Sequence, residues 1–299
     1  MIPSLPKRIQ VFLILLPLLG LCACGNTIGN VVLPMPSVSP SQIPTPTVTP
    51  IPPAIIVNGE EISQAEFEAE LARYQQAQTS LGKTVSPETA RQTVVNDMVD
   101  TLLLAQGASA YGYTVDDATL QSRIDTLASQ VGGDAALSTW ESAHGYTDAD
   151  FRAELGRQIA ASWMRNRVAA SVPATAEQVH VKQILLYNAS DAQQVLSELQ
   201  SGTAFDDLAA QYDPVTKGDL GWFPRNYLPD PAIESAAFAL QTGQYSSIIQ
   251  DDTGYHILFL VERDPARALS PEARLTLQAH ALQDWLAQRR GESTISSTP

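Results

Sequence analysis

The sequence has very few of the residues that form metal sites and covalent cross-links. Its 299 residues include only two cysteines and four histidines. The cysteines lie close together near the N-terminus, whereas the histidines are scattered, at His144, His180, His256 and His280. This spacing matches no zinc site. We therefore expect neither a bound metal nor a cofactor.

Positive charge is also scarce. The chain has 18 Lys and Arg residues against 32 Asp and Glu residues, a net charge of −14. Non-specific nucleic-acid binding needs basic residues that neutralise phosphates, so we expect no nucleic-acid partner. The same charge opposes electrostatic docking of the protein on an anionic membrane. The 44% of apolar residues and the chain length suffice for about two globular domains.

An apolar run near the N-terminus is too short to span a bilayer. It covers the eleven residues Val11 to Leu21 after a short basic start, whereas a membrane-spanning helix needs about 20. It fits the apolar region of a signal peptide, over residues 1–23. The sequence Leu21-Cys22-Ala23-Cys24 resembles a bacterial lipobox, and the small Ala23 makes Cys24 the expected lipidation site. The alternative is an ordinary signal peptide with incidental cysteines.

Residues 24–53 have the composition of a spacer. Eight prolines and no charged residue occur between Asn30 and Pro53. Such a segment cannot bury enough apolar surface to fold alone, and proline favours an extended chain. We expect a stalk between the lipid anchor and the folded body. A proline-rich ligand for a partner domain is the alternative.

The remaining sequence has two patterns, which together predict an α+β fold. Residues 54–175 carry apolar residues at helical spacing behind capping residues, which predicts a helical domain. Residues 176–263 predict the order β, α, α, β, α, β, β, a small α+β domain. Residues 264–291 form a further helix that we expect to pack on the helical domain, and residues 292–299 are expected to be a disordered tail.

Three motifs of the small domain resemble the parvulin (rotamase, PpiC-type) peptidyl-prolyl isomerases. They are Gly218-Asp219-Leu220-Gly221-Trp222-Phe223, Ala236-Ala237-Phe238-Ala239-Leu240 and Gly254-Tyr255-His256-Ile257. In addition, Ile56-Val57-Asn58-Gly59-Glu60-Glu61-Ile62 looks like the start of a SurA/PrsA-type chaperone module. The resemblance implies a helical lobe built from both chain ends, with the parvulin domain inserted between them.

Isomerisation of an X–Pro bond makes modest chemical demands. The barrier of about 18–20 kcal/mol comes from amide resonance, so neither a nucleophile nor a metal is needed. A catalyst must bind the proline ring in an apolar pocket and favour the twisted amide. The resemblance places this pocket at Leu220, Leu228, Ile233 and Phe238. The family usually has Met and Phe where this chain has Leu228 and Ile233, which implies a less aromatic pocket, and Phe238 has a plain core role as its alternative.

The resemblance also implies polar site residues. His256 matches the histidine of the family's terminal strand, with Thr253 as the nearby hydroxyl, although a satisfied core histidine is the alternative. Gln183 stands where parvulins commonly have a second histidine, and its amide could hold His256 in place. Because it lies three positions before Gln183, an odd spacing, His180 is expected on the opposite face of the strand. Asp213 is the carboxylate available on a loop shorter than the family's, either as a site residue or as a turn residue before Pro214.

These features lead to one main hypothesis and two rivals. The main one is an extracytoplasmic isomerase, anchored by lipid to the outer face of a bacterial cell membrane, that assists the folding of unfolded or X–Pro-containing secreted polypeptides. His256, Thr253 and the intact Gly218–Phe223 turn favour this foldase. Gln183 and the short loop favour attenuated activity, or a non-catalytic chaperone with a degenerate parvulin domain. No sequence feature supports the third hypothesis, a scaffold or adhesion lipoprotein.

Overall fold

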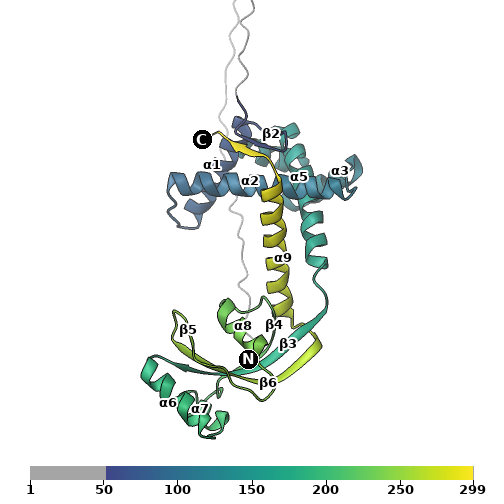
Figure 1. Ribbon diagram of the computed structural model, residues 1–299. Helices are drawn as coiled ribbons and strands as arrows, with labels where there is room; N and C mark the ends of the chain where they lie inside the picture. Colours follow the sequence, from purple (N-terminus) through teal and green to yellow (C-terminus); the bar gives the residue numbers. More distant parts are fainter. Residues whose placement is uncertain (1–51, 299) are drawn as a thin grey trace, which may run out of the picture. The chain divides into compact units, whose positions relative to one another are not determined.

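A computed structural model describes residues 52–298 of the chain. The predicted signal peptide, the lipidation site Cys24 and most of the proline-rich segment lie outside the described residues. The described part consists of a mainly helical lobe and an α+β domain (Figure 1). None of the helices described there is both long and apolar enough to cross a membrane.

The α+β domain is inserted between two segments of the helical lobe. The elements in chain order are β1 (Ile55–Val57), β2 (Glu60–Ile62), α1 (Gln64–Ser80), α2 (Pro87–Ala110), α3 (Asp117–Val131), α4 (Asp134–Ala143), α5 (Asp148–Ala170), β3 (Thr175–Leu186), α6 (Ala189–Gln200), α7 (Phe205–Tyr212), β4 (Asp219–Pro224), α8 (Pro231–Ala239), β5 (Ile249–Gln250), β6 (Tyr255–Ala268), α9 (Pro271–Glu292) and β7 (Ile295–Ser297). The α+β class and the insertion predicted from the sequence are thereby confirmed.

Local sequence signals explain where the long helices begin. Helix α1 starts after Ser63, whose hydroxyl accepts a hydrogen bond from the Glu66 amide at 3.1 Å. Such a cap satisfies an amide that has no partner within the helix. The other side-chain caps in the helical lobe are Ser86, Asp116, Thr147 and Ser270. Proline follows the cap in α2 and α9, where its fixed φ suits the first helical position.

Helix α9 belongs to the core of the helical lobe. It contacts α2 and α5 (Figure 1). Leu282 and Trp285 pack against a buried cluster that includes Met164, and Arg290 Nε lies 2.7 Å from Asp100 Oδ1 on α2. The two ends of the described chain therefore build one lobe, as the resemblance implied.

The expectation of a disordered C-terminal tail was wrong. Residues Ile295–Ser297 form β7, which pairs antiparallel with β1 in the three-stranded order β2-β1-β7. The β1–β2 hairpin leaves the backbone N–H and C=O groups on one edge of β1 unpaired, and β7 pairs with that edge. Ile295 also packs against the core cluster that contains Val57. A three-residue strand flanked by serine and threonine has too little periodicity to be predicted.

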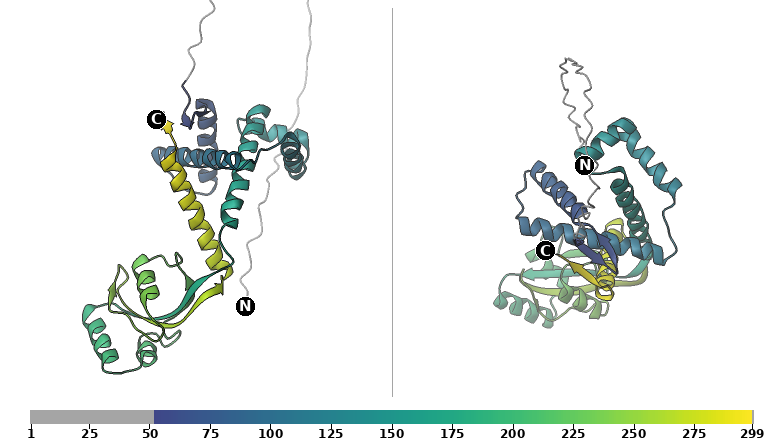
Figure 2. Two further views of the ribbon diagram at one scale, coloured as in Figure 1. Left: turned by 45° about the vertical axis from the view of Figure 1, so that its right-hand side comes forward. Right: turned by 90° about the horizontal axis from the view of Figure 1, so that it is seen from above.

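The sheet of the α+β domain has helices on both faces. Its antiparallel order is β4-β3-β6-β5, with the long strands β3 and β6 in the centre. Side chains alternate along each strand. Ile184 and Ile257 pack with α6 and α7 on one face, whereas Val181 and Leu258 pack with α8 on the other (Figures 1 and 2).

The strand register positions two polar side chains on the face that α8 covers. Leu185 of β3 lies directly opposite His256 of β6, and Gln183 lies opposite Leu258. Because side chains two residues apart share a face, Gln183 is a diagonal neighbour of His256. The pair therefore lies beside the apolar cluster under α8.

Candidate functional site

His256 is the centre of a hydrogen-bonded cluster. The residue is only 5% exposed, although it lies near the start of β6, directly after a turn. Its ring Nδ1 lies 3.2 Å from Gln183 Oε1, and its Nε2 lies 3.1 Å from Thr253 Oγ1. The structure thus brings together three of the four polar residues that the resemblance assigned to the site.

Asp251 completes this cluster and was not foreseen from the sequence. Its Oδ1 lies 3.0 Å from His256 Nε2 and 2.7 Å from Thr253 Oγ1. The hydrogen bond from Thr253, followed by the contact with His256, holds the pKa of the Asp251 carboxyl well below its ordinary value. The signal in the sequence was Asp251 at the start of the turn before His256, where an Asp side chain commonly bonds to the backbone two residues on.

Asp213 has a different environment from the His256 cluster. It lies at the end of α7, where its carboxylate accepts hydrogen bonds from the amides of Val215, Thr216 and Gly218 at 3.0–3.2 Å. Together with the Thr216 hydroxyl, these bonds lower the pKa of Asp213 to about 2. These contacts all lie within the turn. They fit the alternative role of Asp213 as a turn residue.

His180 lies away from the His256 cluster. Its Nε2 is 2.8 Å from Asp219 Oδ1, and its ring stacks on Trp222 with a centroid separation of 5.5 Å. The odd spacing from Gln183 predicted a different face of the strand for this histidine. Its contacts are those of an interaction between neighbouring strands β3 and β4.

The four residues assigned to the proline pocket share one cluster under α8. Ile233 and Phe238 are each 6% exposed, whereas Leu220 and Leu228 are partly exposed at its margin. Phe238 lies edge-on to Phe223, which fits its alternative role in the core. A ligand can reach the two leucines more easily than the two buried residues.

Glu234 holds the loop that carries Leu228. Its carboxylate accepts hydrogen bonds from the amides of Asn226, Tyr227 and Leu228 at 2.7, 2.9 and 3.1 Å. Asn226 has a positive φ of 61°, which turns the three amides toward one acceptor. Sequence reasoning missed this buried carboxylate, because the conformation of the loop decides whether it has partners.

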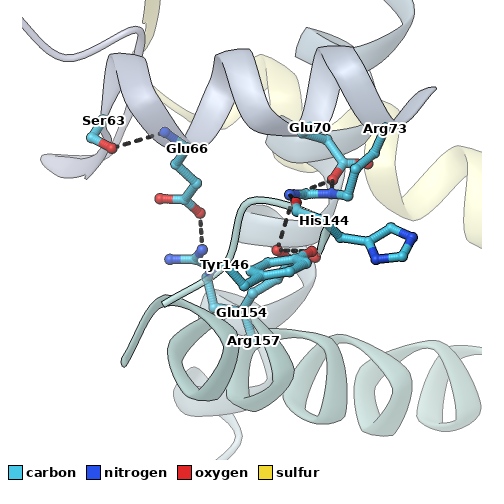
Figure 3. A network of polar contacts seen from close by, with 8 residues as sticks. All are labelled: Ser63, Glu66, Glu70, Arg73, His144, Tyr146, Glu154 and Arg157. Atoms are coloured by element: carbon cyan, nitrogen blue, oxygen red, sulfur yellow. Dashed lines mark hydrogen bonds and ion pairs between the residues drawn. The ribbon is translucent and has the colours of Figure 1, made fainter. Parts of the chain in front are cut away.

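The helical lobe contains a second polar network (Figure 3). Arg73 of α1 lies 2.6 Å from Glu70 and 3.5 Å from Glu154 of α5, while the Tyr146 hydroxyl donates to Glu154 at 2.8 Å. Glu66 pairs with Arg157 in the same region. Burial raises the pKa of Glu66. These contacts connect α1 to α5 beside a cavity of about 80 Å³, whose walls include Ile62, Val94, Met98, Leu102, Glu66, Glu70, Asp97 and Glu154.

Within residues 52–298, no group of His, Cys, Asp or Glu side chains is arranged to hold a metal ion. The His256 cluster consists of hydrogen-bonded side chains on the sheet face that also carries the apolar cluster under α8. Such a site can bind a ring by apolar contact and orient a polar amide next to it.

The fold and the site define a helical chaperone-type lobe with an inserted parvulin-like domain. Comparisons with known families agree: residues 51–148 match the SurA-like N-terminal domain, and residues 173–274 match the PPIC-type PPIASE domain. The chain therefore combines a SurA-like N-terminal domain with a PpiC-type peptidyl-prolyl isomerase domain.

Curated relatives include foldases and chaperones. The foldase protein PrsA of Halalkalibacterium halodurans is 26% identical over 264 residues, covering 78% of this chain and 74% of that protein. PrsA 2 of Bacillus cereus is 27% identical over 180 residues, with 56% and 60% coverage. The periplasmic chaperone PpiD of Haemophilus influenzae is 44% identical over 89 residues, 28% of this chain. The chain spans 14% of PpiD and 60% of PrsA 2, less than two thirds of the length of either protein.

Solved structures of PrsA proteins also resemble this chain. A crystal structure of PrsA from Bacillus cereus has a TM-score of 0.43 at 22% identity, covering 79% of this chain and 84% of that chain. A crystal structure of PrsA from Bacillus anthracis has a TM-score of 0.40 at 22% identity, with 66% and 95% coverage.

Proposed function

We propose that the chain is an extracytoplasmic, lipid-anchored peptidyl-prolyl cis-trans isomerase that assists the folding of secreted proteins. The observation that carries the proposal is the His256–Gln183 pair, which lies on the same face of the sheet as the apolar cluster with the partly exposed Leu228, in a PpiC-type domain. Names of relatives, such as foldase and periplasmic chaperone, support the same class of activity.

In this proposal the site acts on the resonance of the X–Pro amide. The uncatalysed isomerisation takes tens to hundreds of seconds. The proline ring binds against Leu220 and Leu228, and removal of this apolar ring from water contributes binding energy. The polar cluster around His256 orients the amide so that the twisted form is bound better than either planar form. No covalent intermediate is needed.

Gln183 is the reason to propose attenuated activity. A glutamine amide can hydrogen-bond to His256, but it has no titratable group, unlike the histidine that parvulins commonly have. Gln183→His should raise the isomerisation rate or leave it unchanged, since it restores the pair of histidines at similar volume. A fall in rate without a fall in stability would contradict this interpretation of Gln183.

The experiment is a protease-coupled isomerisation assay on X–Pro peptides. We expect the full chain without its signal peptide to accelerate the reaction, and Leu228→Ala to remove most of the acceleration. Wild-type protein that gives no acceleration, yet suppresses the aggregation of an unfolded client, would replace this proposal by that of a chaperone.

The proposed membrane attachment depends on Cys24. The acidic body has little affinity of its own for an anionic membrane. A single acyl chain binds only marginally, so a stable anchor implies at least two chains on the modified terminus. Cys24→Ala should therefore move the protein from the membrane to the soluble fraction. Retention of this variant on membranes after a salt wash would contradict the anchor.

The second candidate, a chaperone without isomerase activity, is favoured by a hollow in the helical lobe. This hollow of about 610 Å³ is lined by Tyr111, Met164, Arg167, Val168, Ala170, Ser171, Ala281, Asp284, Trp285 and Gln288. Tyr111 is 56% exposed there. An exposed aromatic side chain in a hollow that apolar residues also line suits the binding of apolar client segments. Tyr111→Ala should weaken the suppression of client aggregation and leave the isomerisation rate unchanged.

A further inference from the structure

Asp251 has contacts that a surface turn residue would not need. Strand β5 ends at Gln250, and Asp251 begins the turn that leads back into β6. Its Oδ1 accepts hydrogen bonds from the amides of Thr253 and Gly254 at 2.7 and 3.0 Å. The same oxygen faces His256 Nε2 at 3.0 Å, and the side chains of Asp251 and His256 are only 14% and 7% exposed.

The position of the Thr253 hydroxyl is consistent with one protonation of this contact. Its oxygen lies 2.7 Å from Asp251 Oδ1 and 3.1 Å from His256 Nε2. A hydroxyl has one proton, and an ionised carboxylate can only accept. Thr253 therefore donates to Asp251, and both oxygens that face His256 Nε2 are acceptors. This arrangement requires a proton on Nε2.

The amide oxygen Oε1 of Gln183 lies 3.2 Å from the other ring nitrogen, His256 Nδ1. With Nε2 protonated, Nδ1 is either bare, in the neutral ring, or protonated, in the imidazolium. The amide of Gln183 can serve both forms: as placed, its oxygen accepts from a protonated Nδ1, and with the amide flipped its NH₂ group donates to a bare one. A carboxylate at Asp251 and an amide at Gln183 therefore complement each other across the ring.

We propose that Asp251 is a positioning residue that fixes the proton of His256 on Nε2, leaving Nδ1 for Gln183. This inference rests on the proposed isomerase function, because it assigns the orientation of the ring in that site. The low pKa of the Asp251 carboxyl is consistent with it, since the acceptor stays ionised wherever the protein is folded at ordinary pH. Asp251 acts through His256 and is not assigned a contact with the substrate.

The test reads the tautomer of His256 directly. The full chain without its signal peptide, labelled with ¹⁵N-histidine, is studied by long-range ¹H–¹⁵N NMR at a pH where the ring is neutral. We expect the Nε2–H tautomer in the wild type. Asp251→Asn keeps the volume of the side chain but removes its charge, and it should give a mixture of tautomers and an isomerisation rate lower by about tenfold or more, as expected for a lost hydrogen bond to a charged group.

Two further variants control for charge and for folding. Asp252→Asn removes the same charge from the exposed neighbouring residue and should leave both the tautomer and the rate unchanged. Thr253→Val removes the hydroxyl, keeps the carboxylate, and should retain the Nε2–H tautomer. This variant decides the question even when Asp251→Asn fails to fold.

Three results would overturn the inference: a Nδ1–H tautomer in the wild type, no effect of Asp251→Asn on a folded protein, or loss of the Nε2–H tautomer in Thr253→Val. A wild-type protein with the expected tautomer but no isomerase activity would instead reject the proposed function and leave the role of Asp251 intact. The failures of the two proposals are therefore distinguishable.

Discussion

The backbone of Gly218 lies against the backbone of Gln183, and no side chain fits between them. The Gln183 amide donates to the Gly218 carbonyl at 2.8 Å. A Cβ built on Gly218 would lie 1.9 Å from the Gln183 carbonyl oxygen, and Gly218 has a φ of +70°. The turn before β4 thus holds in place the strand position that presents Gln183 to His256.

This contact predicts that Gly218→Ala damages both stability and activity. The positive φ alone costs about 1–2 kcal/mol for a residue with a side chain, and the clash with a backbone atom adds to it because that atom cannot move aside cheaply. In urea unfolding, the free energy of unfolding should therefore fall by clearly more than this conformational cost. The isomerisation rate should also fall, because Gln183 is displaced.

Gly221→Ala is the matched control for that variant. Gly221 has nearly the same φ, +71°, but a Cβ there would meet nothing within 4 Å. Gly221→Ala should lower the stability only by the conformational penalty of about 1–2 kcal/mol. It should retain most of the isomerisation rate. Equal losses for the two variants would mean that the close approach to Gln183 has no consequence.

The partly exposed Leu228 predicts a loss of activity without a large loss of stability. Leu228→Ala removes apolar surface against which the proline ring is proposed to bind, so most of the isomerisation rate should be lost. Its cost in stability should fall below the roughly 2–5 kcal/mol that a fully buried leucine gives.

Leu196→Ala serves as the control, because Leu196 of α6 is also only partly buried and packs against the apolar cluster on the opposite face of the same sheet. It should lower stability by a similar amount and leave the rate at the wild-type value. Rates that fall equally in both variants would show that Leu228 acts through stability alone.

Local signals were sufficient to predict much of the fold. The Asn58-Gly59 hairpin turn and the caps at Ser63 and Ser270 depend on a few neighbouring residues, and the structure has all three. Local signals could not predict the contact of His256 with Gln183, because that contact depends on the register of β3 against β6. The family resemblance supplied that pairing where the sequence pattern alone could not.

Features that depend on loop conformation were missed for a common reason. Glu234 and Asp251 each accept several bonds from backbone amides, and those amides converge only once the loop has formed. Strand β7 was missed because its partner, β1, is more than 230 residues away in the sequence. Neither a converging set of amides nor a distant partner leaves a periodic pattern in the chain.

The low pKa of Asp213 predicts acid-sensitive ordering of the turn before β4. The folded pKa is about 2, below the ordinary 3.8. A lowered carboxyl pKa stabilises the folded turn above the ordinary value, and this stabilisation is lost as the pH falls through the folded pKa. Amide exchange at Thr216 and Gly218, which donate to Asp213, should therefore become less protected between these two pH values.

Asp213→Asn should show reduced protection of these two amides already at neutral pH, and its difference from the wild type should shrink as the pH falls from 3.8 toward 2. Asp207→Asn, on the exposed surface of α7, should follow the wild-type profile. A difference that stays constant across this range would exclude ionised Asp213 as the acceptor.

The last prediction tests the packing of α9 on α2. A Cβ built on Gly107 of α2 would lie 2.7 Å from Cζ2 of Trp285 on α9, whereas a Cβ on Gly156 of α5 would meet nothing within 4 Å. Replacing a helical glycine by alanine gains about 0.5–1 kcal/mol where space allows, so Gly156→Ala should raise the melting temperature. Gly107→Ala should lower it, because displacing a packed aromatic ring typically costs about 1–3 kcal/mol, more than the gain. If Gly107→Ala is as stabilising as Gly156→Ala in thermal unfolding of the full chain, then Trp285 of α9 does not pack closely on α2 at Gly107.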